Sequence, residues 1–231
     1  MILAAGRGTR MQGLTDDRPK PMLPVRGKPI LEHLLDGLRA AGFTRALLVT
    51  GYRRELIEEH FRNYPLELHY RVQEPVDGTG SALLLAREFA AGDAFLMSFG
   101  DILAGADDYL GLAGCLEGDV QTEAVAGVKY VEDPWQGAAV YETEGVITRI
   151  VEKPPQGTST THWNSAGLYA FRPSIFDQLA RIPRSPRREY ELTSAVEQML
   201  AAGRRLRMYA IQGAWRDVGR PEDLAAAERM V

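Results

Sequence analysis

Short apolar segments alternate with helical patterns through the first half of this chain, and this alternation restricts its fold more than any other feature. Strand-like runs at residues 1–4, 46–50, 66–72 and 94–99 are separated by helical patterns at 29–41, 55–61 and 81–90. Parallel strands need a crossover connection, which is usually a helix. The rhythm therefore predicts an α/β fold with a Rossmann-like, mostly parallel sheet flanked by helices.

The second half of the chain has a more β-rich pattern. Strands are expected at 120–130, 138–142, 147–152, 165–171 and 206–211, and helices at 174–181, 191–202 and 221–230. No segment has the composition of a flexible linker. We therefore expect a single domain over residues 1–231, in which a half of about 1–118 continues into a smaller β-rich half of about 119–231.

Composition and charge exclude several classes of protein. The 231 residues are 45% hydrophobic, which is enough for one sizeable core. The net charge of −4 comes without a basic block that would suit nucleic acid. One cysteine cannot form an intrachain disulfide, and no apolar run approaches the roughly 20 residues of a membrane span. We expect a cytoplasmic, stand-alone protein with no nucleic-acid or membrane partner; a homo-oligomer is compatible with the sequence.

A glycine pair follows directly after the first strand. Gly6 and Gly8 permit positive φ angles and a close approach of backbone to a phosphate. The pattern G-x-G-x-x-G fails because Met11 stands where the third glycine is needed, and G-x-x-x-x-G-K-[ST] is absent. Taken alone, the pair indicates either a phosphate loop or a tight turn.

Cationic side chains surround this glycine pair. Arg7 and Arg10 lie within the same loop, and Lys20 stands between Pro19 and Pro21. Proline restricts its own φ and the conformation of the residue before it. We therefore expect Lys20 to lie in an extended segment that presents its ammonium to a phosphate, with a solvated lysine as the alternative.

Two acidic residues follow apolar segments in positions suited to a metal. Asp101 comes directly after the strand expected at 94–99, and Asp217 lies in the sequence W-R-D-V-G. Ligands of open parallel sheets bind beyond the carboxyl ends of the strands. Two carboxylates beside a phosphate ligand suit Mg²⁺. Taken singly, each aspartate is also a plausible turn or capping residue.

A polar loop at residues 73–80 connects an expected strand to an expected helix. The amide of Gln73 offers a donor and an acceptor, so it can pair with the N–H and C=O edge of uracil or thymine. Gly78 would let backbone groups approach that base. The alternative is a plain turn in which Thr79 or Ser81 caps the helix.

These motifs together resemble the signature of the sugar-phosphate nucleotidyltransferase family. The segment L-A-A-G-R-G-T-R-M at 3–11, followed by K-P-M-L-P-V at 20–25, is similar to the motif of the glucose-1-phosphate thymidylyl- and uridylyltransferases, the mannose-1-phosphate guanylyltransferases and the N-acetylmuramate-1-phosphate uridylyltransferases. The resemblance implies the nucleotide-diphospho-sugar transferase fold, with a nucleotide-binding first half and a sugar-binding second half. It also implies transfer of a nucleotidyl group from a nucleoside triphosphate to a sugar 1-phosphate.

The resemblance implies a role for each residue that matches the family's motifs. Charge stabilisation during attack falls to Arg10 and Lys20, and Mg²⁺ ligation to Asp101 and Asp217. The loop at 73–79 resembles the base-recognition loop of members that use UTP or dTTP. The implied nucleotide-binding residues are Leu3, Ala4, Ala5, Gly6, Gly8, Thr9, Gln73, Gly78 and Thr79.

The sugar-binding half carries weaker matches. Glu152 and Lys153 resemble the family's E-K-P, in which the glutamate binds sugar hydroxyls and the lysine contacts the sugar phosphate; the pair alone is equally a solvated strand end. Gly137 resembles the glycine whose backbone contacts the sugar. Asn164 and Ser165 nearly match N-[AT]-G-[IL]-Y, but Asn164 lies one residue too early and Ser165 takes its usual place.

A further segment, E-Y-E-L-T at residues 189–193, resembles the family's E-Y-x-L-T, which opens a helix. Its expected role is limited to capping and docking.

The implied reaction requires no general base. A phosphate monoester has a second pKa of about 6, so the attacking oxygen is already anionic at neutral pH. In-line attack on the α-phosphorus then needs positioning and charge neutralisation. The alternatives are a cytidylyl- or guanylyltransferase for another sugar or an alcohol phosphate, and a non-catalytic regulatory paralogue that binds sugar nucleotides.

Overall fold

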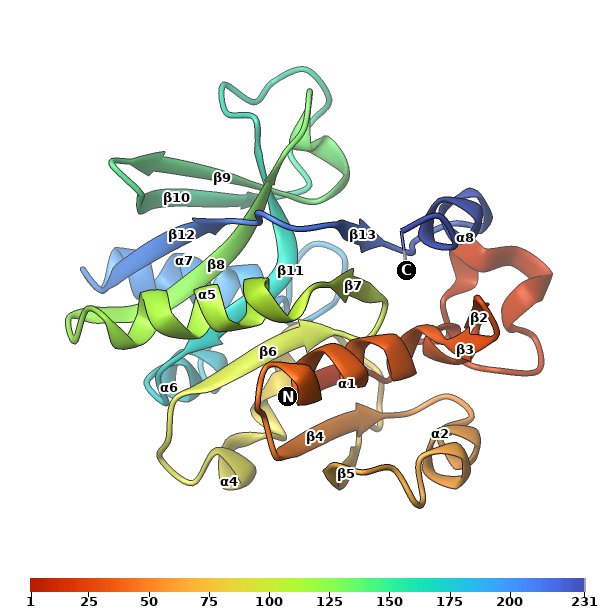
Figure 1. Ribbon diagram of the computed structural model, residues 1–231. Helices are drawn as coiled ribbons and strands as arrows, with labels where there is room; N and C mark the ends of the chain where they lie inside the picture. The colour runs from red at the N-terminus through yellow and green to blue at the C-terminus, as the bar shows by residue number, and fades with distance from the viewer. Residues whose placement is uncertain (231) are drawn as a thin grey trace.

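The computed structural model describes residues 1–230 and is built on a nine-stranded mixed sheet (Figure 1). The strands of this sheet are β1 (Ile2–Ala4), β4 (Arg45–Thr50), β5 (Glu67–Val72), β6 (Phe95–Phe99), β8 (Thr122–Tyr130), β9 (Ala138–Thr143), β10 (Val146–Glu152), β11 (Trp163–Phe171) and β12 (Arg205–Ala210). Their order across the sheet is β5-β4-β1-β6-β11-β8-β12-β10-β9.

The direction of the strands differs between the two halves of the sheet. Strands β5, β4, β1 and β6 are parallel, as expected. From β11 onwards the pairing is antiparallel except between β8 and β12. The α/β fold is confirmed, whereas "mostly parallel" describes only the first half. The physical reason is the connections: helices cross over between the first strands, while the tight turn at Glu144 and Gly145 joins β9 to β10 as a hairpin.

Helices cover both faces of the sheet. They are α1 (Ile30–Ala40), α2 (Arg54–His60), α3 (Thr79–Leu84), α4 (Arg87–Ala90), α5 (Ala106–Glu117), α6 (Ile175–Leu179), α7 (Leu192–Ala201) and α8 (Pro221–Ala227). Helices α1, α2 and α5 pack on one face, and α3, α4, α6 and α7 on the other. In α1 the spacing of Leu31, Leu34, Leu35 and Leu38 gives one apolar stripe, which is fully directed into the core.

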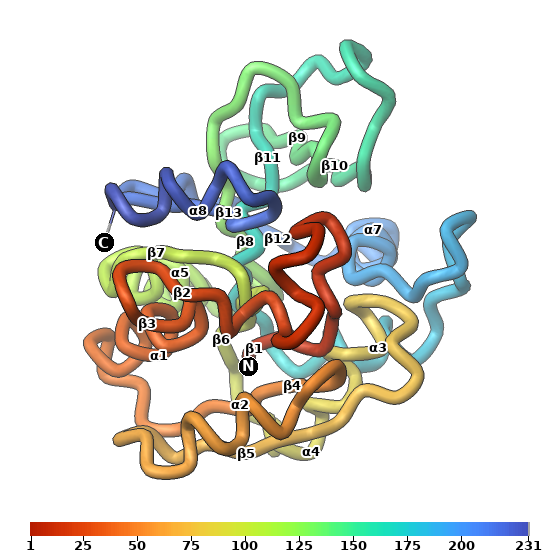
Figure 2. Tube along the Cα trace, turned by 90° about the vertical axis from the view of Figure 1, so that its right-hand side faces the viewer, coloured from red at the N-terminus to blue at the C-terminus, as the bar shows by residue number. Residues whose placement is uncertain are grey.

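A two-stranded ribbon stands beside the main sheet. It pairs β7 (Ile102–Ala104), which directly follows the end of β6, with β13 (Trp215–Asp217) from the end of the chain. A second small ribbon pairs β2 (Pro24–Val25) with β3 (Lys28–Pro29). Strands β9 and β10 form one edge of the nine-stranded sheet, and in Figure 2 they lie with the beginning of β11 above β1, β4 and β5.

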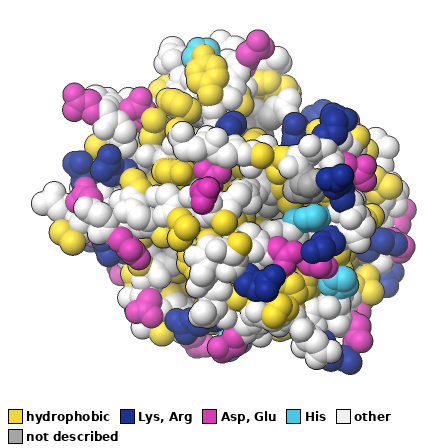
Figure 3. Space-filling model, viewed as in Figure 1, with side chains coloured by type: hydrophobic (Ala, Val, Ile, Leu, Met, Phe, Trp, Pro, Cys, Tyr) yellow, Lys and Arg dark blue, Asp and Glu magenta, His cyan; other side chains and the backbone are white. Residues whose placement is uncertain are grey.

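The surface in the view of Figure 3 carries acidic and basic side chains in an interspersed pattern. Ion pairs between neighbouring side chains occur on the surface of the protein, such as that of Lys28 with Asp36, whose charged atoms are 3.0 Å apart. Within residues 1–230, no helix has the length and apolar character needed to cross a bilayer.

Candidate functional site

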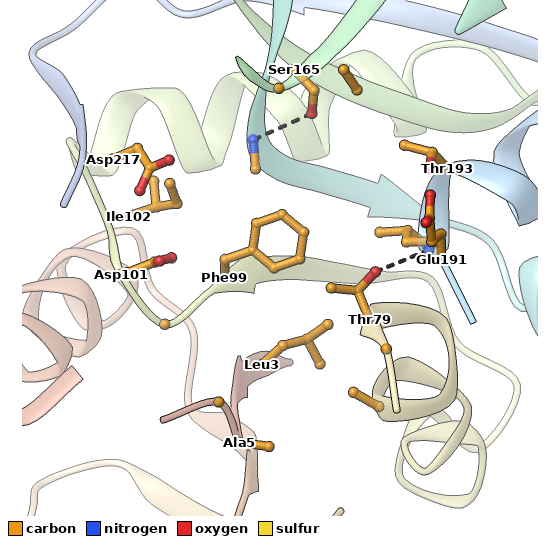
Figure 4. Close-up of a pocket in the computed structure, with 18 of the residues that line it drawn as sticks. Leu3, Ala5, Thr79, Phe99, Asp101, Ile102, Ser165, Glu191, Thr193 and Asp217 are labelled. Atoms are coloured by element: carbon orange, nitrogen blue, oxygen red, sulfur yellow. Dashed lines mark hydrogen bonds between the residues drawn. The ribbon is translucent and has the colours of Figure 1, made fainter. Parts of the chain in front are cut away.

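A cavity of about 410 Å³ lies beyond the carboxyl ends of β1 and β6 and is closed on its other side by residues of the second half (Figure 4). It gathers all but one of the residues to which the family resemblance assigns a binding or catalytic role. Those that line it are Leu3, Ala4, Ala5, Gly6, Gly8, Arg10, Lys20, Gln73, Gly78, Thr79, Asp101, Gly137, Glu152, Lys153, Asn164, Ser165 and Asp217. The exception, Thr9, is exposed and begins the 3-10 segment Thr9–Thr15.

The glycine loop turns sharply at Gly8. This residue has a left-handed backbone with φ of 77°, and a Cβ placed on it would lie 2.7 Å from Cβ of Lys20. Both the conformation and the close approach require glycine. The stem of Lys20 therefore packs directly on the loop. Arg7 faces away: its guanidinium pairs with Asp16 at 3.1 Å and stacks over the ring of Tyr52.

The backbone at Lys20 differs from the extended conformation that we expected. Lys20 opens a 3-10 turn, Lys20–Met22, and Pro19 is the extended residue before it. Pro21 fits this turn because the first N–H groups of a helical turn have no intrahelical partner, so its missing donor costs nothing there. The side chain of Lys20 is mostly buried, and its ammonium forms an ion pair with Asp101 inside the cavity.

The β7–β13 ribbon brings the two predicted carboxylates together. Asp101 immediately precedes β7, and Asp217 pairs in register with Ile102. The two side chains lie beside each other at one end of the cavity (Figure 4). The cavity wall desolvates the carboxyl of Asp217 in part, although the side chain stays accessible to solvent, and together with the negative charge of Asp101 this raises the pKa of Asp217 to about 6, while Lys20 opposes the shift. Two carboxylates that repel each other are a suitable place for a divalent cation.

No cluster of three or more acidic, histidine or cysteine side chains suited to a metal occurs within residues 1–230. The site therefore offers two carboxylates and leaves further coordination positions to water and phosphate oxygens. This donor set fits Mg²⁺, which keeps several waters and takes only one or two protein carboxylates.

Gln73 lines the cavity and is held by two hydrogen bonds. Its side chain is buried, and its amide nitrogen donates to the carbonyl of Gly78 at 2.8 Å and to Oγ of Ser81 at 3.0 Å. Both donor hydrogens are thus used within the protein. The amide oxygen remains as the group that can accept a hydrogen bond from a ligand.

The loop that follows Gln73 docks onto the start of α7. The N–H of Leu192 donates to Oγ1 of Thr79 at 3.0 Å, so this hydroxyl caps α7 rather than its own helix. A Cβ on Gly78 would lie 2.3 Å from the carbonyl oxygen of Tyr190. The segment at 189–193 therefore has the docking role expected of it, and Glu191 and Thr193 additionally line the cavity.

Glu152 and Arg187 face each other at the opposite end from the aspartates. Their charged atoms are 3.3 Å apart, and Arg187 also pairs with Glu191 at 3.0 Å. Burial raises the pKa of Glu152, and the charge of Arg187 opposes that shift. Sequence reasoning missed Arg187, because it lies in the polar stretch 183–188; its only signal is its place just before the E-Y-E-L-T segment.

Asn164 and Ser165 lie just before an irregular part of strand β11. Between Ser165 and Tyr169 the register against β8 shifts, so that three residues of β11 stand opposite one residue of β8, and Gly167 adopts φ of 72° there. Asn164 and Ser165 both line the cavity. The Oδ1 atom of Asn164 is buried with no hydrogen-bond partner among the described residues. Such an atom suits a ligand hydroxyl or amide.

Gly137 lies against Asn164. A Cβ at position 137 would come within 2.3 Å of Oδ1 of Asn164. The glycine therefore leaves room for the asparagine side chain as well as exposing its own backbone to the cavity.

Comparison with known proteins identifies the family. The sequence profile of the nucleotidyl transferase family matches residues 1–231. The chain belongs to this family. The resemblance inferred from the glycine loop and the K-P-M-L-P-V segment is therefore confirmed.

Two relatives align with nearly the whole of this chain. The bifunctional protein GlmU of Methanocaldococcus jannaschii is 34% identical over 99% of this chain and 53% of its own length. The UTP–glucose-1-phosphate uridylyltransferase AglF of Haloferax volcanii is 34% identical over 99% of this chain and 94% of its own. The chain thus spans about half the length of GlmU and nearly all of AglF.

Solved structures of this nucleotidyl transferase fold superpose closely. A UDP-glucose pyrophosphorylase in complex with UDP-glucose gives a TM-score of 0.87 at 24% identity, covering 99% of this chain and 96% of that one. A Bacillus anthracis protein described as a glucose-1-phosphate thymidylyltransferase gives 0.86 at 25% identity, covering 99% and 92%. The predicted fold class is confirmed.

Proposed function

We propose that this protein transfers a nucleotidyl group from a nucleoside triphosphate, preferably UTP or dTTP, to a sugar 1-phosphate with the help of Mg²⁺. The observation that carries the proposal is the composition of the cavity. Cations, paired carboxylates, a rigid amide and unpartnered polar groups line one space of about 410 Å³. That volume is within the ordinary range for a small-molecule site.

The reaction is an in-line displacement at the α-phosphorus. An anionic oxygen of the sugar phosphate forms a bond to this phosphorus, the bond to the β-phosphate oxygen breaks, and pyrophosphate leaves with the electron pair. Arg10 and Lys20 stabilise the negative charge of the two anions that must meet. No side chain is required to remove a proton, because the attacking phosphate is already deprotonated.

Asp101 and Asp217 are the residues that would hold Mg²⁺. When bound, the ion supplies charge neutralisation to phosphate oxygens. Asp101 also pairs with Lys20, and because both of these side chains are mostly buried, water screens their charges less than it would at the surface.

Gln73 supports a preference for uracil or thymine over cytosine. Its amide hydrogens are committed to Gly78 and Ser81, so its oxygen faces a base as an acceptor. Uracil and thymine carry an imide N–H that can donate to this oxygen, whereas cytosine has none at the same position. The name of AglF, a UTP–glucose-1-phosphate uridylyltransferase, agrees with this preference.

The opposite end of the cavity suits a sugar. Glu152 and the unpaired Oδ1 of Asn164 accept hydrogen bonds from hydroxyls, and the backbone of Gly137 lies between them in the lining. Lys153 and Arg187 provide positive charge for the sugar phosphate. In this arrangement the phosphates lie at the end of the cavity with Asp101 and Asp217, and the sugar lies at the end with Glu152.

A pyrophosphate-release screen tests the proposal. Five nucleoside triphosphates are each combined with a panel of sugar 1-phosphates and with phosphocholine and inositol phosphate, with Asp217→Asn as the control protein. Release with UTP or dTTP and a sugar 1-phosphate supports the proposal. Release only with CTP or GTP, or with an alcohol phosphate, favours those substrates instead. No release with any pair favours a non-catalytic binding protein.

A further inference from the structure

A buried acid outside the cavity holds the segment that leads to Asp217. Asp108 lies in the first turn of α5 and is only 1% exposed. Its carboxylate accepts hydrogen bonds from the N–H groups of Gln212 at 2.8 Å and Gly213 at 3.1 Å, and from the hydroxyl of Tyr209 at 3.4 Å. A buried carboxylate is costly unless it is hydrogen-bonded, so these contacts tie the β12–β13 connection firmly to α5.

These hydrogen bonds close one end of the β7–β13 ribbon. Ala104, the last residue of β7, pairs with Trp215, the first residue of β13. Beyond this pair, β7 continues through a single residue into α5, which carries Asp108. On the other side, β13 is preceded by the loop that contains Gln212. Asp108 therefore joins the two chain segments just past the ribbon's last rung.

The opposite end of the ribbon carries the two cavity carboxylates. Asp217 pairs with Ile102, and the N–H of Val218 donates to the carbonyl of Asp101 at 3.0 Å. The ribbon has only three rungs. Because the ribbon is so short, a shift of the loop at one end should also shift Asp217 relative to Asp101 at the other end.

The contact between the loop and the acid is too close for any side chain at position 213. A Cβ on Gly213 would lie 2.7 Å from Oδ2 of Asp108. This fit makes Gly213→Ala an independent way to disturb the contact without altering Asp108 itself.

We propose that Asp108 is a positioning residue for the metal pair: by holding Gln212 and Gly213, it sets the position of Asp217 relative to Asp101. This inference rests on the proposed function, because the metal role of the two aspartates belongs to that proposal. Asp108 touches neither the cavity nor its ligands and acts through the backbone of the ribbon.

The substitution Asp108→Asn tests this role. An amide has one acceptor oxygen, and its NH₂ group would face a backbone N–H, so at least one of the loop's hydrogen bonds is lost. Mn²⁺ binding, titrated by electron paramagnetic resonance without nucleotide, should weaken about tenfold. Amide exchange at residues 212–217 should accelerate, while kcat at saturating Mg²⁺ should stay within about twofold of the wild-type value.

Gly213→Ala should reproduce the weaker Mn²⁺ binding and decides the question if Asp108→Asn does not fold. Gly114→Ala is the matched control, since this residue of α5 has open space where the methyl group would go. A lower melting temperature with wild-type Mn²⁺ affinity in both test variants would overturn the proposal. Such a result would mean that Asp108 stabilises the fold without affecting the metal site.

Asp217→Asn separates this inference from the proposed function. If Asp217→Asn abolishes Mn²⁺ binding while Asp108→Asn and Gly213→Ala leave it unchanged, only the positioning role fails. If Asp217→Asn binds Mn²⁺ as the wild type does, the metal site itself is wrong, and the positioning role fails with it.

Discussion

Lys20 and Asp101 contact each other directly, so the cation assigned to the substrate phosphates is paired with a carboxylate assigned to the metal. Both side chains are mostly buried, and the stem of Lys20 is fixed against Gly8. An ammonium and a divalent cation compete for the same carboxylate. We therefore expect Lys20 to have two opposing effects, one on chemistry and one on metal binding.

The substitution Lys20→Met should separate these effects. Loss of the phosphate contact should lower kcat by about 10²–10³. Mn²⁺ binding without nucleotide should become about fivefold tighter, because Asp101 loses its competing partner. Kinetics and an electron paramagnetic resonance titration measure the two quantities. Lys28→Met, at an exposed lysine outside the cavity, serves as the control. Unchanged or weaker Mn²⁺ binding in Lys20→Met would contradict the competition.

Metal binding should depend on pH through Asp217, whose pKa is raised to about 6 by partial desolvation and by Asp101. Below this pH the carboxyl carries a proton that a metal must displace, and above it the carboxylate is free. The apparent Mg²⁺ activation constant should thus be flat near pH 7.5 and rise by up to about tenfold between pH 6 and pH 5. Activity titrations with Mg²⁺ at several pH values measure this constant; a value independent of pH over this range disproves the role of Asp217.

Gly8→Ala should damage catalysis by displacing Lys20. The added methyl group would meet Cβ of Lys20 at 2.7 Å, and alanine would be strained at φ of 77°. We expect kcat to fall at least about tenfold, with a loss of about 1–2 kcal/mol in the free energy of unfolding. Gly13→Ala is the control, because its Cβ would meet nothing closer than 3.7 Å. Equal kinetics in both variants would show that Lys20 tolerates the shift.

Removal of the charge at Arg187 should alter the acid limb of the pH–rate profile. Burial raises the pKa of Glu152, and Arg187 restrains that rise. In Arg187→Gln the pKa should rise further, so the ionised carboxylate that accepts sugar hydroxyls is lost at a higher pH as the pH falls. We expect the acid limb of kcat/KM for the sugar 1-phosphate to move upward by about one pH unit.

Arg188→Gln provides the neighbouring control for this shift, because it removes one charge from the same exposed loop. An identical displacement of the acid limb in both variants would mean that the loop's general charge, rather than the contact with Glu152, is responsible.

Sequence reasoning placed most of the sheet because it follows from local patterns, and the family resemblance singled out about half of the residues that line the cavity. The stripe of leucines in α1 and the buried run of β4 coincide with the expected elements to within a residue or two. Among the residues given a binding or catalytic role by the resemblance, Thr9 is the one that does not line the cavity. Gly8, just before Thr9, turns the chain sharply, and its packing against Lys20 determines where Thr9 lies.

The features that sequence did not predict depend on tertiary contacts. No helix was expected at α5, because its small residues leave no clear apolar stripe in the sequence. In the structure, Tyr109, Leu112 and Leu116 pack on the sheet and fix the position of this helix. The expected helix at 81–90 breaks into α3 and α4. The β7–β13 ribbon joins segments more than a hundred residues apart, which no local pattern can show.

This ribbon also has a consequence for synthesis of the chain. A ribosome makes Asp101 long before Asp217, and β13 has no partner except β7 within the described residues. Strands β1, β4, β5 and β6 can pair as soon as residue 99 has emerged, whereas the paired carboxylates exist only after residue 217 has. A nascent or prematurely terminated chain therefore carries the glycine loop and its lysine without the complete pair of carboxylates, and the proposed release of pyrophosphate would arise in one of the last steps of assembly.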